Sequence, residues 1–416
     1  MDHQIARRYG MKVRLVRTEK KLSLRELSKR SGVSLSMLSR IETALHIPKA
    51  STREKIEHVL GFTYEASDNI CETFQSKYDA LYRNIIMVDH VQAASIARHL
   101  YETRARYENA PCYPEYYLIM LMYTLHMHHY RHVITPYLHA VEQLEDVYSA
   151  QASELRLIEL ATHAVAIGED KCAETLLDNH ERINEDKTLF GINSYLRGIL
   201  QAKNPSQFKE SLSTLKVAQS VFERTNNFFH VMYTKAIAQR VYIYMNRFDV
   251  FEELYEDVSR FAQIEGQFAL HHYGEFSRVR AEIAQKRYHN ALAILRTISV
   301  DTLDHRYFTL YARFRLNLVQ KGEAVMDQFI PGDDAVETAL SKMFFEAIAH
   351  WSFHGEDEVF IEKLKAFTDA AFDEAEYMYV KMAYTLYVDC LKRRRRYKLA
   401  HQYAERMLAL TNAIIM

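Results

Sequence analysis

Glycine and proline are scarce in this sequence. Its 416 residues include 11 glycines and 6 prolines, whereas an average protein contains about 7% and 5% of these residues. Both residues mark turns and interrupt regular structure, so a chain poor in them is expected to consist mostly of helices joined by short connections. The scarcity argues against a β-sandwich, a glycine-rich nucleotide-binding fold and a disordered low-complexity chain.

Features of exported and membrane-spanning chains are also absent. No run approaches the roughly 18 consecutive apolar residues that a membrane span requires, and no apolar stretch follows the basic residues near the N-terminus. We therefore expect a cytoplasmic protein that makes no membrane contact. The cysteines show no CxxC spacing, so we expect no zinc site and no disulfide, but small buried side chains. They are Cys71, Cys112, Cys172 and Cys390.

Motifs of catalysis and of metal or cofactor binding are missing as well. The sequence contains no Walker loop, HExxH, GxSxG or kinase signature, so we expect no enzyme activity and no cofactor. Four histidines straddle a predicted turn without a carboxylate or cysteine to complete a ligand set, and we expect no metal site there. They are His126, His128, His129 and His132. The basic run at residues 392–396 is expected to be a solvated turn between helices.

The net charge of −1 hides an asymmetry along the chain. Residues 1–60 carry 14 Lys and Arg against 6 Asp and Glu, a net charge of +8, so the remaining residues carry −9. A basic N-terminal segment on an acidic body indicates that this segment, and not the body, binds a polyanion.

The order of residues in the basic segment predicts a helix-turn-helix. A first helix ends near residues 20–21, and Ser23 with Glu26 forms a capping box at the start of a short second helix. Gly32 is expected to end that helix in a left-handed conformation, and Ser34 to cap the next one. Two helices joined by a tight glycine turn form the geometry in which the second helix lies in the DNA major groove.

The run LSLRELSKRSGVSLSMLSRIE at residues 22–42 resembles the Cro and phage-repressor (Xre-type) DNA-binding domain. A fourth helix over residues 52–60, opened by Ser51 and closed by Gly61, fits the same resemblance. The resemblance implies a salt bridge between the first and third helices, formed by Arg17 and Glu42. It also implies that the start of the recognition helix faces base edges. The candidates for DNA contact are Ser23, Arg25, Ser34, Leu35, Ser36, Ser39 and Arg40.

Among these candidates, Arg40 is expected to contact a guanine through two hydrogen bonds, and Leu35 to touch a thymine methyl group. The family usually has a glutamine directly after the cap of the second helix, where it contacts a phosphate. Leu24 stands at that position here, so we expect Arg25 to take over the phosphate contact. The turn after the recognition helix, usually Asn-Gly or similar in the family, is Thr-Ala at residues 43–44.

The rest of the chain shows a repeat of about 40 residues. A similar pair of residues recurs from His90 to Tyr288 at intervals of 40, 40, 38, 40 and 40, and again at Tyr397. Each period is long enough for two amphipathic helices and two short loops, the unit of a helical solenoid. The units resemble tetratricopeptide repeats, slightly longer than usual. The sequence thus predicts an all-α protein, in which an N-terminal helix-turn-helix domain precedes an α-solenoid of tetratricopeptide-like helical hairpins. We place the helix-turn-helix domain at 1–63, a linker helix at 64–80, and the repeat domain, for sensing and dimerisation, at 81–416.

An Xre-type domain followed by tetratricopeptide-like repeats resembles the RRNPP-type receptors of Gram-positive bacteria, cytoplasmic transcription factors that respond to short secreted peptides. At 416 residues the chain is nearer to the longer, NprR-like members than to the PlcR or Rgg types. The resemblance implies a quorum-sensing homodimer that binds an inverted-repeat operator on double-stranded DNA, with a short signalling peptide on the concave face of the repeats. Two alternatives stay open: the repeats bind another regulatory protein, or the chain is an Xre-type repressor without a ligand.

The repeat spacing gives candidates for peptide contact. If residues 208, 248 and 288 are equivalent, the first helix of each unit begins about 16 residues earlier, and its inward positions recur from unit to unit. A second set lies seven residues further along the same face. Asparagine offers a donor and an acceptor to a peptide backbone, and arginine binds a terminal carboxylate. The candidates are Asn193, Tyr233, Arg240, Tyr273 and Arg280.

Overall fold

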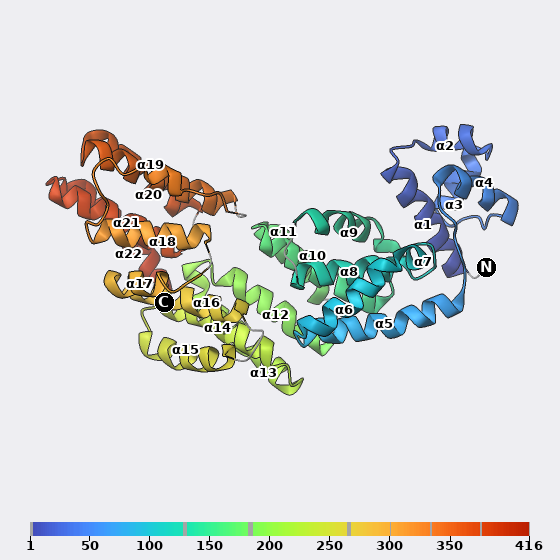
Figure 1. The fold of residues 1–416 in the computed structure, drawn as a ribbon, viewed down its shortest axis with the longest axis horizontal. Helices are drawn as coiled ribbons and strands as arrows, with labels where there is room; N and C mark the ends of the chain where they lie inside the picture. Colours follow the sequence, from blue (N-terminus) through green and yellow to red (C-terminus); the bar gives the residue numbers. More distant parts are fainter. Residues whose placement is uncertain are drawn as a thin grey trace. The chain divides into compact units, whose positions relative to one another are not determined.

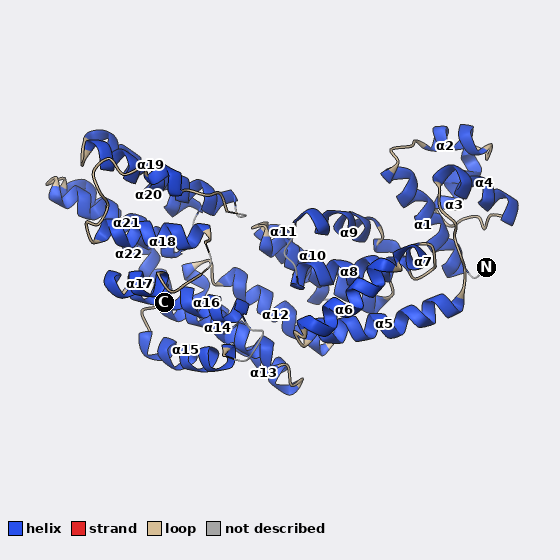
Figure 2. Cartoon of the chain, in the orientation of Figure 1, coloured by secondary structure: helices blue, strands red, loops and turns tan. Residues whose placement is uncertain are grey.

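The structure is a computed structural model that describes residues 3–127, 131–181, 186–263, 268–299, 301–332, 335–374 and 377–415. In these ranges the regular structure is entirely helical, without a strand (Figure 2), which confirms the all-α prediction. No helix in the same ranges is long and apolar enough to cross a membrane. The chain forms two compact units: unit 1 contains residues 1–164 and 171–189, and unit 2 contains residues 165–170 and 190–416.

The first four helices of unit 1 form the helix-turn-helix, drawn in dark blue in Figure 1. They are α1 (His3–Glu19), α2 (Leu24–Ser31), α3 (Leu35–Glu42) and α4 (Ala50–Leu60). The predicted capping box is present: the hydroxyl of Ser23 accepts the N–H of Glu26 at 3.2 Å, and the Glu26 carboxylate accepts the N–H of Ser23 at 2.7 Å. Gly32 ends α2 with a φ of 69°, as predicted.

The fourth helix differs from the prediction at its start. α4 begins at Ala50, two residues before the predicted start, and its N-cap residue Lys49 makes no side-chain capping bond. Ser51 therefore lies inside the first turn instead of capping it. The start of α4 is exposed, so water can satisfy the N–H groups that a capping side chain would otherwise bind. The predicted end is correct, because Gly61 follows α4 with a φ of 69°.

In the rest of unit 1, α5, α6, α7 and α9 pack on α8. α5 packs on both α6 and α8, and α8 packs on α9. α8 is the most deeply buried of them, with Tyr116, Leu118, Ile119 and Leu121 fully inaccessible to solvent. The elements are α5 (Asp68–Ile86), α6 (His90–Glu102), α7 (Arg104–Glu108), α8 (Tyr113–Met127), α9 (Arg131–Gln143), η1 (Glu145–Val147), α10 (Ala150–Ala166) and α11 (Asp170–Glu181).

Unit 2 is a series of helical hairpins, in which consecutive helices such as α14 and α15, α16 and α17, and α19 and α20 pack together. The elements are α12 (Lys187–Gln201), η2 (Pro205–Gln207), α13 (Phe208–Arg224), α14 (Phe228–Tyr244), α15 (Phe248–Ala262), α16 (Phe268–Ala284), α17 (Tyr288–Leu295), α18 (Leu303–Arg315), η3 (Val325–Gln328), α19 (Ala335–His354), α20 (Glu358–Glu374), α21 (Tyr377–Arg393) and α22 (Tyr397–Ile415).

The 40-residue period predicted from the sequence is the spacing of the second helices of the hairpins. α6, α11, α13, α15, α17 and α22 begin at the recurring residues 90, 170, 208, 248, 288 and 397, while the recurring residue Tyr130 falls outside the described residues. The first helices start earlier than expected. α14 and α16 begin 20 residues before their partners, not 16, because each is a 17-residue helix followed by a three-residue turn. Those turns contain a left-handed residue, Asn246 in one and Lys286 in the other.

The C-terminal hairpin of α21 and α22 packs against η2, α13 and α14, near the start of unit 2. The ring of Tyr377 lies 5.9 Å from that of Phe208 and 5.6 Å from that of Tyr244, measured between centroids. α22 packs on η2, and the Lys381 ammonium donates to the Asn246 side chain at 3.0 Å. One continuous apolar core therefore joins the start of unit 2 to its end.

Candidate functional site

The recognition helix α3 is fixed by its buried face. Leu38 and Ile41 are fully buried, and the carboxylate of Glu42 accepts two hydrogen bonds from the Arg17 guanidinium, at 2.7 and 2.9 Å. This pair is the predicted salt bridge between the first and third helices, and the structure confirms it. Gly10 of α1 lies against the same helix, where a Cβ atom would stand 2.1 Å from the carbonyl oxygen of Ile41. α1 and α3 thus meet backbone to backbone.

The opposite face of α3 and its approach are exposed. Leu35, a large apolar side chain, has 42% of its surface accessible. Exposed apolar surface is unfavourable in water, and a bound partner that covers it would remove this free-energy cost. Within the described residues, the guanidinium groups of Arg25 and Arg40 take part in no salt bridge or hydrogen bond. All seven candidates for DNA contact are exposed: Ser23, Arg25, Ser34, Leu35, Ser36, Ser39 and Arg40.

Two of these serines also cap helices. The hydroxyl of Ser23 accepts the Glu26 N–H and donates to the Glu26 carboxylate at 2.8 Å. Hydrogen bonds from the backbone N–H and then the hydroxyl of Ser23 hold the pKa of Glu26 below its usual range. The hydroxyl of Ser34 accepts the N–H of Met37 at 3.3 Å. Ser23 is therefore committed to the capping box, whereas Ser34 keeps its hydroxyl proton for a phosphate or a base.

The N-terminal half of α1 packs on the repeat helices of unit 1. The Arg8 guanidinium donates to both carboxylate oxygens of Glu115, at 2.9 and 2.5 Å, and to the carbonyl of Pro111 at 2.6 Å. The Tyr113 hydroxyl donates back to the Arg8 carbonyl at 3.0 Å. Lys12 is only 4% exposed, and this burial lowers its pKa. The helix-turn-helix is therefore bound directly to the helices that follow it.

The candidates for peptide contact lie on the first helices of three hairpins of unit 2. The structure brings two of them together, because Arg240 donates to the Tyr273 hydroxyl at 2.7 Å. Tyr233 is half-buried on α14. Asn193 is only 3% exposed, and its side-chain oxygen accepts a hydrogen bond from Arg197, one turn along α12, at 2.9 Å.

Arg280 belongs to a separate cluster. It donates to the Asp304 carboxylate of α18 at 2.9 Å, and the Tyr379 hydroxyl of α21 donates to the same carboxylate at 3.1 Å. Its guanidinium also lies 5.3 Å from the centroid of the Phe308 ring. The charge of Arg280 is thus neutralised by Asp304, and an incoming carboxylate would have to share or replace that contact.

The histidine cluster is only partly described. His126 contacts the fully buried carboxylate of Glu159 at 3.1 Å. Burial acts to lower the pKa of His126, but the Glu159 carboxylate outweighs it and the pKa is raised. His128, His129 and the side chain of His132 lie outside the described residues. Elsewhere in the described ranges, no three His, Cys, Asp or Glu side chains are grouped as a metal site requires.

The basic run at 392–396 ends α21 and forms the turn before α22, and all five residues are exposed, as expected. Two of its arginines also form surface pairs: Arg393 donates to Glu356 at 3.0 Å and Arg396 to Glu358 at 2.6 Å.

The expectation of four buried cysteines is correct for Cys112 and Cys390 only. Cys172 is exposed and Cys71 is half-buried, so these two cysteines are not the buried core residues that were expected.

Comparison with known proteins agrees with this architecture. Residues 13–66 match the family described as helix-turn-helix. No curated protein matches the sequence. Among solved structures, the apo form of the quorum sensor NprR from B. thuringiensis is similar, with a TM-score of 0.56 and 11% sequence identity. The similarity covers 82% of this chain and 99% of the other. The N-terminal segment is therefore an Xre-type helix-turn-helix domain, and most of the chain shares the fold of the quorum sensor NprR.

Proposed function

We propose that this protein is a cytoplasmic transcriptional regulator that binds specific DNA sequences through α3 and is controlled by a short signalling peptide bound to unit 2. The observation that carries the proposal is the arrangement of α3. One face is locked to α1 by Arg17 and Glu42. Four of the seven exposed candidates lie on α3 and the others at its N-cap or at the start of α2, on a segment with a net charge of +8. A helix with one exposed face on a positively charged domain can enter the major groove of DNA.

The peptide is proposed from the body of the protein. The fold is similar to that of NprR, which is described as a quorum sensor. The side chains of Arg240 and Tyr273 join two successive hairpins by a hydrogen bond. A peptide that contacts several hairpins at once would be held by groups of this kind.

A homodimer is part of the proposal. Two copies related by a two-fold axis would present two recognition helices in opposite orientation, so the operator should be an inverted repeat. Its half-sites should be centred one helical turn, or a whole number of turns, apart.

Replacing Arg40 by alanine should weaken binding to the operator by about 1–3 kcal/mol, which is about 5- to 150-fold in Kd. A bidentate contact to guanine would be lost, while α3 would keep its buried face. Fluorescence anisotropy at fixed salt, on a labelled operator and on a scrambled duplex, measures the loss. Arg98→Ala, which removes an exposed arginine from α6, is the matched control and should bind like the wild type. Unchanged operator affinity in Arg40→Ala would refute the base contact.

Replacing Arg240 by alanine should abolish the response to peptide, because the variant loses the group that bonds to Tyr273 across two hairpins. The probe is the peptide fraction of spent medium from the host culture, and the measured quantity is the ratio of operator Kd with and without it. Arg247→Ala is the matched control, since Arg247 is an exposed arginine paired with Asp249 in a turn. A response that is equally strong in Arg240→Ala and the wild type would show that the peptide binds elsewhere.

A further inference from the structure

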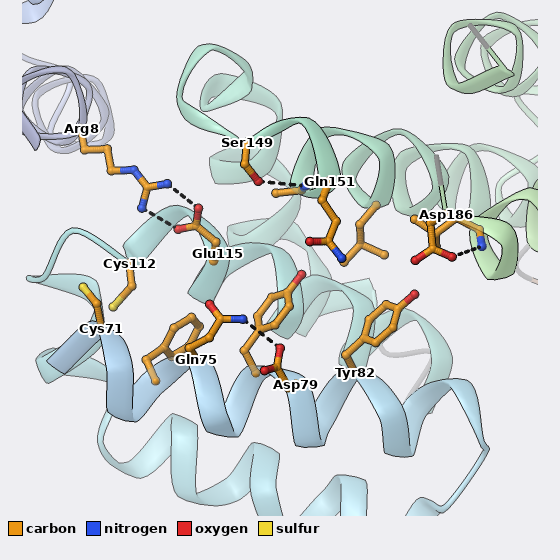
Figure 3. Close-up of a pocket in the computed structure, with 15 residues that line it drawn as sticks. Arg8, Cys71, Gln75, Asp79, Tyr82, Cys112, Glu115, Ser149, Gln151 and Asp186 are labelled. Atoms are coloured by element: carbon orange, nitrogen blue, oxygen red, sulfur yellow. Dashed lines mark hydrogen bonds and ion pairs between the residues drawn. The ribbon is translucent and has the colours of Figure 1, made fainter. Parts of the chain in front are cut away.

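Unit 1 contains a pocket of about 290 Å³ beside the contact between α1 and α8. α5 contributes one wall, and Arg8 and Glu115 lie at one end (Figure 3). Cys71 and Cys112 line the same pocket, and in Figure 3 their sulfur atoms lie next to each other near the Arg8–Glu115 pair. Nothing in the DNA-binding or peptide-binding role uses these two thiols.

The two thiols come from different parts of unit 1. Cys71 is in the first turn of α5 and is half-buried, and Cys112 directly precedes α8 and is 5% exposed. Both thiols line the same pocket, and their sulfur atoms are neighbours in Figure 3. Neighbouring thiols can close a disulfide, with a bond length of about 2.05 Å, when their side chains rotate toward each other.

The surroundings make the two thiols chemically unequal. The neighbouring Cys112 thiol lowers the pKa of Cys71, and the positive charge of Arg8 acts in the same direction. The pKa of Cys112 is raised, first by the neighbouring Cys71 and then by burial. Cys71 is also the more accessible of the two, since Cys112 is only 5% exposed. The thiolate is the nucleophile in thiol chemistry, so Cys71 is the group that reacts first and Cys112 the group that resolves the product.

We propose that Cys71 and Cys112 form a reversible oxidation site, which hydrogen peroxide converts from two thiols to an intramolecular disulfide. The Cys71 thiolate attacks one peroxide oxygen, the O–O bond breaks, and the departing hydroxide takes up the thiol proton to become water. The Cys112 sulfur then attacks the sulfur of the Cys71 sulfenic acid, the S–O bond breaks, and the second oxygen leaves as water with the Cys112 proton. The two thiols lose two electrons and two protons, and one peroxide becomes two waters.

The position of the pair gives the oxidation a consequence. Cys112 stands between Pro111 and Glu115, two of the residues that accept hydrogen bonds from Arg8. A disulfide to Cys71 would tie α5 to the segment that holds α1. Intracellular disulfides are generally transient and redox-sensing, which fits a pair that is free in its reduced form.

The test uses the full chain and hydrogen peroxide as the probe. After oxidation of the folded protein, alkylation in denaturant should count two free thiols instead of four. Peptide mass spectrometry should find Cys71 linked to Cys112, and dithiothreitol should restore both thiols. Before oxidation, Cys71 should be alkylated at pH 7 before Cys112, because Cys71 is the more accessible thiol and its pKa is lowered.

Two variants complete the test. Cys172→Ala, the matched control, should form the disulfide as the wild type does. Cys112→Ala should form none, and its Cys71 should be trapped by dimedone as the sulfenic acid. The proposal would be overturned if peroxide treatment of the wild-type protein left Cys71 and Cys112 unlinked. That outcome includes both thiols remaining reduced and oxidation of Cys172 or Cys390 in their place.

Discussion

Replacing Arg8 by alanine is expected to destabilise unit 1 by about 3–5 kcal/mol, the usual cost of removing one partner from a buried ion pair. The side chains of Arg8 and Glu115 are only 13% and 16% exposed. Without Arg8, the Glu115 carboxylate would stay in a position where burial already raises its pKa despite the neighbouring guanidinium. The carbonyl of Pro111 would lose its hydrogen bond from Arg8 as well.

The neighbouring residue provides a matched control. Arg7 pairs with Asp146 at 3.6 Å, but these two side chains are 50% and 68% exposed. Exposed pairs of this kind contribute about 0–1 kcal/mol, so Arg7→Ala should behave almost like the wild type. The double variant Arg8→Met with Glu115→Leu removes both charges and should recover much of the loss, because it leaves no unpaired buried charge.

Hydrogen exchange of peptides from α1 and α8 measures the effect, since it follows unit 1 alone. The single tryptophan, Trp351, lies in α19 of unit 2 and packs on Phe314. The change in its fluorescence on unfolding therefore reports on unit 2. The midpoint of that unfolding transition should be the same in the wild type, the two single variants and the double variant. Equal protection of α1 in Arg8→Ala and Arg7→Ala would contradict a structural role for the Arg8–Glu115 contact.

Replacing Gly10 by alanine is expected to disrupt the helix-turn-helix. The added Cβ would stand 2.1 Å from the carbonyl oxygen of Ile41 and 3.1 Å from its carbonyl carbon, so α1 and α3 would have to separate. Overpacking typically costs about 1–3 kcal/mol and occasionally more, and this clash is with backbone that no rotamer change can relieve. The displacement would also strain the Arg17–Glu42 pair, so operator binding should be lost together with stability.

Gly274→Ala is the control for helix propensity. Gly274 is also inside a helix, α16, but the nearest atom to an added Cβ is a ring carbon of Tyr255 at 4.0 Å. Alanine is favoured over glycine in a helix by about 0.5–1 kcal/mol, so this variant should be as stable as the wild type or more stable. Thermal unfolding by circular dichroism and operator binding are compared for both variants. A Gly10→Ala protein that binds the operator normally would show that α1 and α3 are not in close backbone contact.

Local chemistry explains which parts of the fold could be predicted from the sequence. The capping box at Ser23 and the left-handed Gly32 depend on residues a few positions apart, and the structure confirms them. The recurring residue pair found in the sequence falls at the starts of α13, α15 and α17. The predicted start of the first helices was wrong by about four residues. Asn227 caps α14 and was the available start signal, but the turns after α14 and α16 use a left-handed Asn or Lys instead of Gly.

Contacts between distant residues could not be predicted in the same way. Arg8 and Glu115 are separated by 107 positions, and Cys71 and Cys112 by a whole repeat, so no local motif pairs them. The role of Gly10 could not be predicted from the sequence either. A glycine within a helix is explained only when the backbone that packs against it is known. Among the proposed peptide contacts, the equivalence of repeats correctly placed Arg240 and Tyr273 on adjacent helices, but it could not show that Arg280 is neutralised by Asp304.

Sequence-specific DNA binding under peptide control is tested most directly by a genomic pull-down. The purified full-length protein is mixed with sheared DNA from its own host, with and without the peptide fraction of spent medium, and the retained DNA is sequenced. We expect enrichment of one inverted repeat, a change in that enrichment when the peptides are present, and its loss in Arg40→Ala. Enrichment that is the same with and without the peptides would contradict peptide control. A folded wild-type protein that enriches no sequence in either condition would contradict the proposed function.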